Sequence, residues 1–186
     1  MKVTLTDIAD VLILEPKVFG DSRGFFYESY NKKAFEEATG FKGAFVQDNH
    51  SRSSKGVLRG LHFQIEQPQG KLVRAVRGAV LDVVVDIRRE SPTFGRWISV
   101  ELSEENHRQL WVPPGLAHGF VVVTPMADFL YKTTEFYAPR HERCLAWNDP
   151  AVAVDWQLAK YVIDTPSLSA KDSVGIPLNA LPPAVA

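Results

Sequence analysis

Alternation of apolar and polar residues is the feature that most constrains how this chain can fold. Apolar residues occupy every second position from Leu81 to Ile87. In a β-strand such positions share one face, because successive side chains point to opposite sides of the sheet. The same period predicts further strands at 97–102, 119–124 and 129–137. The sequence therefore predicts a β protein rather than a helical one.

Glycine and proline separate these segments and predict tight turns. The turn signals include Gly56, Gly78, Ser91-Pro92, Gly95, Pro113-Pro114-Gly115, Thr124-Pro125 and Ala138-Pro139. Many short strands at regular spacing favour an antiparallel sandwich or barrel. In a jelly roll the polar face of a strand can line an internal pocket, so polar strand residues become candidates for function.

One segment departs from the strand pattern. Residues 31–39 predict a helix, with Asn31 as the N-cap and Gly40 ending it. The chain from about residue 165 is polar and contains proline, so we expect irregular structure there. Neither a repeat nor a linker divides the sequence, and residues 1–186 are expected to form a single domain.

Charge and cysteine content limit the partners and the compartment. Of 186 residues, 21 are Lys or Arg and 22 are Asp or Glu, so the net charge is -1. Neither nucleic acid nor a membrane is an expected partner, because the surface lacks a strong positive field. Cys144 is the only cysteine and the N-terminus lacks an apolar signal-peptide stretch, so we expect a cytoplasmic protein.

Two histidines, His62 and His118, are candidates for a metal site. His62 lies in a predicted strand, and His118 follows Pro113-Pro114-Gly115 in a pattern that resembles the second cupin motif. A metal-binding cupin places a second histidine two residues after the first, to let several imidazoles converge on one ion. Here that position is Gln64. The sequence therefore predicts a cupin-like shell without a metal.

A pocket without a metal needs side chains for proton transfer and charge stabilisation. Tyr131 and Tyr137 are an even number of residues apart, so in a continuous strand both face one side. They are interpreted either as core packing or as a proton donor and a platform for a flat ring. The candidates for chemistry are His62, Lys71, Asp82, His118, Tyr131 and Tyr137.

Arg23 and Arg59 are candidates for phosphate binding, because a guanidinium group can bind a phosphate through two hydrogen bonds. Each arginine alone is more typical of an ordinary surface charge. A glycine-rich loop between a strand and a helix is absent, which excludes the nucleoside triphosphatase and Rossmann interpretations.

Taken together, the motifs resemble those of the dTDP-4-dehydrorhamnose 3,5-epimerase family of metal-free cupins. They run in family order over about residues 5–175, and the ordered set is specific although each motif alone is weak. The matching stretches are 20–28 (GDSRGFFYE), 45–51 (FVQDNHS), 57–64 (VLRGLHFQ), 69–73 (QGKLV), 85–88 (VDIR), 111–115 (WVPPG), 118–120 (HGF), 131–134 (YKTT), 141–143 (HER) and 168–172 (LSAKD).

The resemblance implies a reaction and a set of roles. The expected fold is an all-β, cupin-like jelly roll, and the expected substrate is dTDP-4-dehydro-6-deoxy-D-glucose, inverted at C3 and C5 without a cofactor. His62 would be the general base, with Asp172 orienting it. Lys71 would stabilise the enolate oxygen at C4, and Tyr131 would return a proton from the opposite face. The implied substrate-binding residues are Arg23, Glu28, Gln47, Asp48, Asn49, Arg59, His118, Tyr137, Glu142 and Lys171.

The resemblance also implies a homodimer, and it leaves alternatives open. Cys144 and the run 146–149 depart from the commoner family pattern, but neither is a proposed catalytic group. Related enzymes invert only one of the two centres, so a single-centre epimerase is an alternative. A sugar-nucleotide-binding cupin without turnover is another, disfavoured because the base, the lysine and the tyrosine are all present. Gln64 argues against a metal-dependent cupin enzyme.

Overall fold

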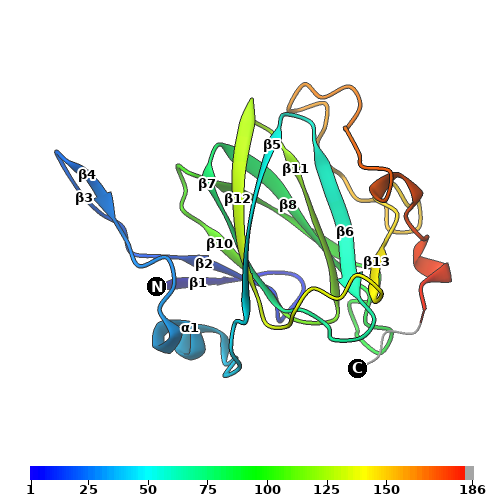
Figure 1. Ribbon diagram of the computed structural model, residues 1–186, viewed down its shortest axis with the longest axis horizontal. Helices are drawn as coiled ribbons and strands as arrows, with labels where there is room; N and C mark the ends of the chain where they lie inside the picture. The colour runs from blue at the N-terminus through cyan, green and yellow to red at the C-terminus, as the bar shows by residue number, and fades with distance from the viewer. Residues whose placement is uncertain (183–186) are drawn as a thin grey trace.

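The computed structural model describes residues 1–182 and contains two large antiparallel sheets. The first sheet has the strand order β1 (Lys2–Leu5), β2 (Leu12–Glu15), β10 (Gln109–Val112), β7 (Lys71–Arg77), β12 (Met126–Thr133) and β5 (Gln47–Ser54). The second has the order β13 (Glu142–Cys144), β6 (Leu58–Gln64), β11 (Leu116–Val122), β8 (Ala79–Asp86) and β9 (Trp97–Ser103). Strands β5 to β12 alternate between the two sheets except at the β8–β9 hairpin, where both strands lie in the second sheet, and this jelly-roll order confirms the expected cupin-like, all-β fold (Figure 1).

The alternating pattern located several strands well. The predicted strands at 80–88 and 97–102 correspond to β8 and β9. The prediction at 129–137 is partly wrong, because β12 ends at Thr133. Tyr137 therefore lies in the loop between β12 and β13 rather than on the strand face that carries Tyr131.

Apolar side chains form three layers around the two sheets. The space between the sheets is filled by residues such as Val84, Leu102 and Phe129. The outer face of the second sheet packs beneath the C-terminal segment, where Trp156 and Leu178 contribute. Because both faces are covered, every residue of β8 is buried. The C-terminal segment is largely irregular, as expected, with short 3₁₀ helices at Asp172–Val174 and Leu178–Ala180.

The third layer lies against the outer face of the first sheet, under the predicted helix. Helix α1 (Lys32–Thr39) begins at Asn31, whose side chain accepts a hydrogen bond from the Ala34 amide, and Gly40 ends it in the left-handed conformation. Phe35 of this helix packs on Trp111. None of the helices in the described part of the chain is long and apolar enough to cross a membrane.

The N-terminal region extends away from the two sheets. Strands β3 (Phe19–Asp21) and β4 (Gly24–Phe26) form a separate hairpin that projects from the body (Figure 1). Its aromatic residues are exposed, with exposed fractions of 53% for Phe19, 63% for Phe25 and 66% for Phe26. A hairpin with this much exposed aromatic surface is unusual unless another surface covers it.

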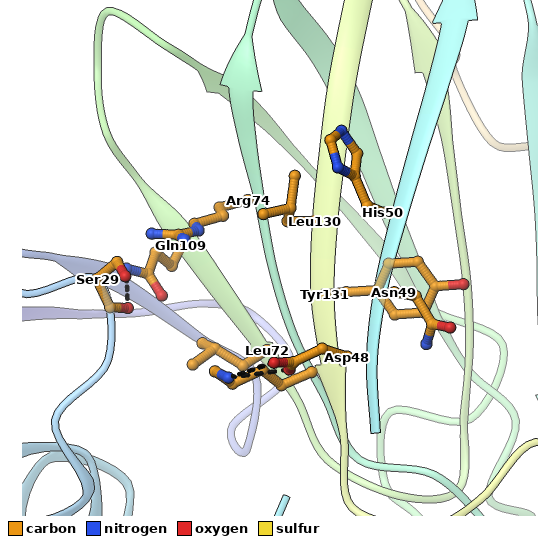
Figure 2. Close-up of a pocket in the computed structure, with 10 residues that line it drawn as sticks. Ser29, Asp48, Asn49, His50, Leu72, Arg74, Gln109, Leu130 and Tyr131 are labelled. Carbon is orange, nitrogen blue, oxygen red and sulfur yellow. Dashed lines mark hydrogen bonds and ion pairs between the residues drawn. The ribbon is translucent and has the colours of Figure 1, made fainter. Parts of the chain in front are cut away.

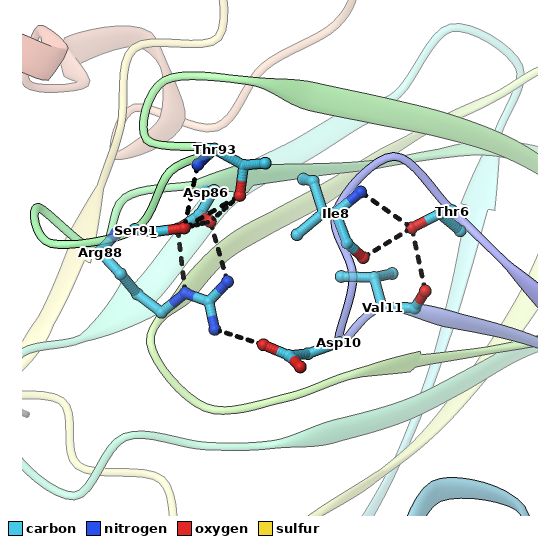
Figure 3. Close-up of polar contacts among 8 residues, drawn as sticks. All are labelled: Thr6, Ile8, Asp10, Val11, Asp86, Arg88, Ser91 and Thr93. Atoms are coloured by element: carbon cyan, nitrogen blue, oxygen red, sulfur yellow. Dashed lines mark hydrogen bonds and ion pairs between the residues drawn. The ribbon is translucent and has the colours of Figure 1, made fainter.

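A buried carboxylate ties the start of the chain to the second sheet (Figure 3). Asp86, at the end of β8, accepts hydrogen bonds from Arg88, Ser91 and Thr93. Arg88 also contacts Asp10 at 2.9 Å. Burial alone would raise the pKa of Asp86, but these hydrogen bonds outweigh it and lower the pKa to about 2.

Candidate active site

A pocket of about 350 Å³ lies between the two sheets. This volume falls within the usual range for small-molecule sites. Strands from both sheets contribute its walls, so its opposite sides belong to different sheets. The lining residues are Gln47, Asn49, Ser51, Arg59, His62, Gln69, Lys71, His118, Gly119, Phe120, Phe129, Tyr131, Tyr137, Glu142 and Lys171.

His62 occupies the middle of β6, between two strands that pair with it. Its Cα partners are His118 on β11 and Cys144 on β13. Strands β6 and β11 approach closely beside this site, since a Cβ atom on Gly119 would lie 2.5 Å from the Arg59 carbonyl oxygen. Glycine at this crossing therefore allows the two histidines to lie side by side.

His62 is held by a carboxylate from the C-terminal segment. Its Nε2 lies 2.5 Å from Asp172 Oδ1, and Ser169 Oγ donates to Asp172 Oδ2 at 2.7 Å. Burial alone would raise the pKa of Asp172, but the hydrogen bonds from His62 and Ser169 outweigh it, and the net pKa is lowered. Asp172 therefore stays ionised at neutral pH, with one carboxylate oxygen against the imidazole. Because Nε2 faces Asp172, Nδ1 is the ring nitrogen left to accept a proton from a bound molecule.

Lys71 brings a positive charge into the same pocket. It begins β7, is 8% exposed, and its Nζ lies 3.4 Å from the His62 carbonyl oxygen. Burial lowers its pKa to about 8, although Glu142 and Asp82 oppose the shift. At neutral pH the ammonium group is therefore still charged, in a setting where its field is poorly screened by water.

Tyr131 lies on β12 in the sheet opposite His62. Its ring contacts Phe129, with centroids 6.1 Å apart. Burial raises the pKa of the phenol, and the nearby Glu142 adds to the shift while Arg59 opposes it. Tyr131 therefore stays protonated at neutral pH and can donate a proton from the wall facing the imidazole.

A second histidine–aspartate pair lies next to the first. His118 Nε2 is 2.9 Å from both carboxylate oxygens of Asp82, and both residues are buried. Burial raises the pKa of Asp82, whereas His118 and Lys71 oppose the shift. Asp82 was one of the candidates for chemistry in the sequence. It does not line the pocket itself, but it binds His118, which does.

The rim of the pocket carries a chain of polar contacts. The Tyr137 hydroxyl donates to Glu142 Oε2 at 2.9 Å, and Lys171 Nζ lies 2.7 Å from the same oxygen. Arg59 stands nearby, with its Nε bonded to Ser53 Oγ at 3.1 Å. Its terminal guanidinium nitrogens have no partner among the contacts within residues 1–182, so they are available to an anion.

The structure brings most of the sequence-predicted residues together. Asp172 joins the pocket through His62. The predicted residues that line the pocket are His62, Lys71, Tyr131, Gln47, Asn49, Arg59, His118, Tyr137, Glu142 and Lys171.

Asp48 is not brought to this pocket. Residues of β5 alternate in direction, so Gln47 and Asn49 face the pocket and Asp48 faces the outside of the sheet. There it accepts hydrogen bonds from Lys132 at 2.9 Å and 3.0 Å. Figure 2 shows Asp48 and His50 on one side of β5 and Asn49 and Tyr131 on the other.

Arg23 and Glu28 also lie outside the pocket of their own chain. Arg23 sits at the turn of the projecting β3–β4 hairpin and pairs with Asp21. Glu28 accepts hydrogen bonds from Asn31 at the start of the helix. The hairpin formed by β3 and β4 projects from the body (Figure 1), whereas Glu28 lies in the segment between β4 and the helix.

The sequence-predicted site did not include five lining residues, which are Ser51, Gln69, Gly119, Phe120 and Phe129, or Ser169 behind them. Ser51 lines the pocket and shares the strand parity of Gln47 and Asn49, so alternation could have found it. Gln69 lines the pocket from a loop, and Ser169 holds Asp172. Loop residues follow no period, so alternation did not mark these two, although both lie inside the family motifs 69–73 and 168–172.

One group of possible metal-ligand atoms lies close together beside the pocket. The ligand atoms of His62, Cys144 and Asp172 lie within 4.8 Å of one another. However, the His62–Asp172 separation of 2.5 Å is that of a hydrogen bond, with no space for an ion between the two atoms. Burial and the nearby Asp172 raise the pKa of the Cys144 thiol to about 12, which opposes the thiolate that a metal requires. This group fits a metal poorly.

Comparisons with known proteins agree with the geometry. The dTDP-4-dehydrorhamnose 3,5-epimerase family profile matches residues 5–180. A protein of that name from Pseudomonas aeruginosa is 62% identical over 175 residues, which cover 94% of each chain. A dTDP-6-deoxy-D-glucose-3,5-epimerase from Legionella pneumophila, solved in complex with dTDP-4-keto-L-rhamnose, is 51% identical with a TM-score of 0.93, covering 97% of this chain and 94% of its own.

A more distant structure is also similar in fold. A 3′-monoepimerase from Streptomyces bikiniensis, solved with dTDP-quinovose, is 34% identical with a TM-score of 0.86. The match covers 94% of this chain and 87% of that one. The fold alone therefore does not separate enzymes that invert two centres from those that invert one.

Proposed function

Because this chain belongs to the dTDP-4-dehydrorhamnose 3,5-epimerase family, we propose that its pocket inverts C3 and C5 of dTDP-4-dehydro-6-deoxy-D-glucose to give dTDP-4-dehydro-L-rhamnose. The observation that carries the proposal is the convergence of three groups on one pocket. A histidine–carboxylate pair, a buried lysine and a tyrosine all meet there, and the tyrosine comes from the opposite sheet.

The reaction begins with removal of a proton next to a ketone. The C4 carbonyl acidifies the protons at C3 and C5, and His62 Nδ1 takes the proton while Asp172 stabilises the imidazolium. Negative charge then builds on the carbonyl oxygen. A preorganised charged or polar group at such a position is worth about 3–4 kcal/mol, and Lys71 supplies it here.

Inversion requires the proton to return to the other face of the sugar. His62 and Tyr131 stand on different sheets, on opposite walls of the pocket. Tyr131 therefore serves as the acid that reprotonates the enolate, and the sugar need not turn over between the two steps. No cofactor is required, because the substrate brings its own ketone.

The rim residues hold the nucleotide part of the substrate. Arg59 and Lys171 suit the diphosphate, and the exposed ring of Tyr137 suits stacking on thymine. Gln47, Asn49, His118 and Glu142 complete the contacts through hydrogen bonds. The higher identity to 3,5-epimerases than to the 3′-monoepimerase, 62% against 34%, supports inversion at both centres.

A D2O experiment tests the function. With dTDP-4-dehydro-6-deoxyglucose, NMR should show deuterium at both C3 and C5 and formation of the L-rhamno product. Deuterium at one centre alone would identify a single-centre epimerase, and no exchange would identify a binding protein. Activity should also survive prolonged treatment with a chelator, whereas loss restored by zinc, iron or manganese would identify a metal enzyme.

Variants separate the base from the acid. His62→Asn should lose both exchange and product, whereas Tyr131→Phe should keep some exchange while inversion falls by about 10²–10⁴-fold. Lys71→Ala should reduce exchange and inversion together, because the enolate loses its counter-charge. If Tyr131→Phe loses exchange and His62→Asn keeps it, the two roles are reversed.

We further propose a homodimer in which the β3–β4 hairpin reaches the partner's pocket. The hairpin carries exposed Phe25 and Phe26, and it holds Arg23 away from the pocket of its own chain. A two-fold symmetric dimer would bury these rings and bring Arg23 and Glu28 to the partner's nucleotide. Light scattering should give twice the chain mass, and Phe25→Ser combined with Phe26→Ser should shift it toward the monomer.

We also propose that the protein works in the cytoplasm, where its product, dTDP-4-dehydro-L-rhamnose, is the precursor of dTDP-L-rhamnose for cell-surface polysaccharide. Its reduced, buried Cys144 and its dTDP-sugar substrate support this placement. Fractionation should place the activity with cytoplasmic markers, and recovery from the periplasm would contradict the proposal.

A further inference from the structure

The loop between β12 and β13 is held by glutamine side chains. In this loop, residues 135–138, the Ala138 carbonyl accepts from the backbone amides of His141 and Glu142, and glutamine side chains from elsewhere in the chain bind other backbone groups. Gln69 Nε2 donates to the Glu135 carbonyl at 2.9 Å, and Gln47 Oε1 accepts from the Tyr137 amide at 3.1 Å. The loop thus depends on side chains for the contacts that a strand would make with backbone.

Gln64 makes the largest share of these contacts. Its Oε1 accepts from the Ala138 amide at 2.8 Å, and its Nε2 donates to the Phe136 carbonyl at 3.3 Å and to the Gln67 carbonyl at 2.7 Å. Only an amide can accept one of these bonds and donate the other two. The contacts therefore explain why a glutamine, rather than a carboxylate or an imidazole, stands at this position.

Gln64 does not itself reach the pocket. It is 7% exposed and absent from the pocket lining, whereas Tyr137, between the two loop residues that it binds, does line the pocket. The Tyr137 ring also meets Glu142 through its hydroxyl. Fixing the backbone on both sides of Tyr137 limits where that ring can go.

We propose that Gln64 is a positioning residue for nucleotide binding, which holds the 135–138 loop so that Tyr137 is placed to stack on the base. The position at which a metal-binding cupin carries a ligand is used here to brace a loop at the rim. This inference rests on the proposed function, since it deepens the role given there to Tyr137. Its effect falls on binding of the nucleotide rather than on the proton transfers at His62.

Amide hydrogen exchange on the ligand-free protein tests whether Gln64 holds the 135–138 loop. Gln64→Met keeps the size of the side chain and removes all three bonds, so the amides of Tyr137 and Ala138 should exchange faster. Gln64→Glu keeps the bond from Ala138 and loses the two donated bonds, so it should have a smaller effect. Asp149→Asn is the control, because Asp149 binds the backbone of Ala151 and Leu178 outside the pocket lining. Unchanged exchange at the loop in both Gln64 variants would overturn the proposal.

Titration with dTDP tests the role in binding. Tyr137→Ala should weaken binding by about tenfold or more, as expected for a lost base-stacking partner. Gln64→Met should weaken it by about fivefold, with a raised KM and nearly unchanged kcat, because preorganisation of the ring is lost. Asp149→Asn should leave dTDP binding unchanged.

The double variant decides between positioning and general damage. If Gln64 acts through Tyr137, then adding Gln64→Met to Tyr137→Ala should weaken dTDP binding by less than about twofold more. A full additional loss, or a fall in kcat without a change in KM, would show that Gln64 acts elsewhere and would overturn the proposal. If the wild-type protein does not bind dTDP, the proposed function is wrong. Hydrogen exchange would then still show whether Gln64 holds the 135–138 loop.

Discussion

Lys71 carries its charge in a place where an ammonium group is costly. Its pKa of about 8, against an ordinary value of 10.5, means that the folded protein binds this proton less readily than the unfolded chain. The cost is present at pH 7 and disappears as the pH rises through 8 to 10.5, where both states lose the proton. Its position beside His62 fits the proposal that the charge serves the reaction and not folding.

Replacing Lys71 with methionine should separate stability from activity. At pH 7 the free energy of unfolding should increase by about 3 kcal/mol, since a shift of one pKa unit corresponds to 1.36 kcal/mol. Turnover should be lost, because the enolate oxygen has no counter-charge. Urea unfolding at pH 7 and pH 10.5 provides the measurement, and the stability gain should shrink at the higher pH. A variant less stable than wild type at pH 7 would contradict this explanation.

The same lysine predicts the alkaline limit of the activity. As the pH rises through about 8, Lys71 becomes neutral and kcat/KM should fall. Tyr131 does not titrate in this range, because burial raises the pKa of its phenol. A pH profile checks the prediction, and Lys71→Arg should move the alkaline limit upward in any residual activity. A profile that stays flat to pH 10 would mean that the charge on Lys71 is not needed.

At the scale of elements, the crossing of β6 and β11 is the tightest point near the site. A Cβ atom on Gly119 would lie 2.5 Å from the Arg59 carbonyl and 3.1 Å from Gly60 Cα, both of them backbone atoms. Gly119→Ala should therefore cost about 1–3 kcal/mol of stability and displace His118 and His62, which lowers activity. Gly20→Ala is the stability control, since its Cβ would meet nothing closer than 3.7 Å. Thermal unfolding of both variants tests this, and equal melting temperatures would be inconsistent with a tight crossing.

The alternation of apolar and polar residues predicted the strands whose side chains are buried on a defined face. It failed to predict the segments that have no such face. Strands β8 and β9 followed from it, because their side chains pack against a core. All residues of β1 are exposed, so burial leaves no pattern in its sequence. The pattern predicts one strand over 129–137, which would put Tyr137 on the face of Tyr131, yet β12 ends at Thr133 and glutamine side chains hold the loop that follows.

The identities of the site residues were predicted more completely than their positions relative to one another. Family motifs named the residues, but only the strand direction of β5 separates Asn49 from Asp48, and that rule was available in the sequence. The His62–Asp172 contact joins residues 110 positions apart, and no local pattern fixes such a distance. The location of Arg23 depends on how a hairpin without core contacts is oriented, which burial does not determine.

At the scale of the molecule, the Asp86 network joins the N-terminal segment to the barrel through Arg88 and Asp10. With a pKa of about 2 in the folded state, against an ordinary value of 3.8, Asp86 contributes stability that is present above pH 4 and lost as the pH falls through 2. Asp86 therefore contributes about 2 kcal/mol to the free energy of unfolding. Asp86→Asn should be less stable at pH 7, and its unfolding free energy should fall less steeply than that of wild type between pH 4 and 2. If the unfolding free energies of the variant and of wild type fell equally steeply between pH 4 and 2, this role for Asp86 would be contradicted.

If the β3–β4 hairpin reaches the partner's pocket as proposed, its outward reach places the two halves of one working centre in different copies of the chain. Consider Arg23→Ala and His62→Asn, each impaired on its own and mixed after unfolding and refolding together. In a mixed pair, one pocket receives an intact His62 from its own chain and an intact Arg23 from its partner, and the other pocket receives neither. Roughly half of the pairs would be mixed, so about a quarter of wild-type activity should reappear at low substrate concentration. Activity equal to the mean of the two separate variants would show that each chain is catalytically self-sufficient.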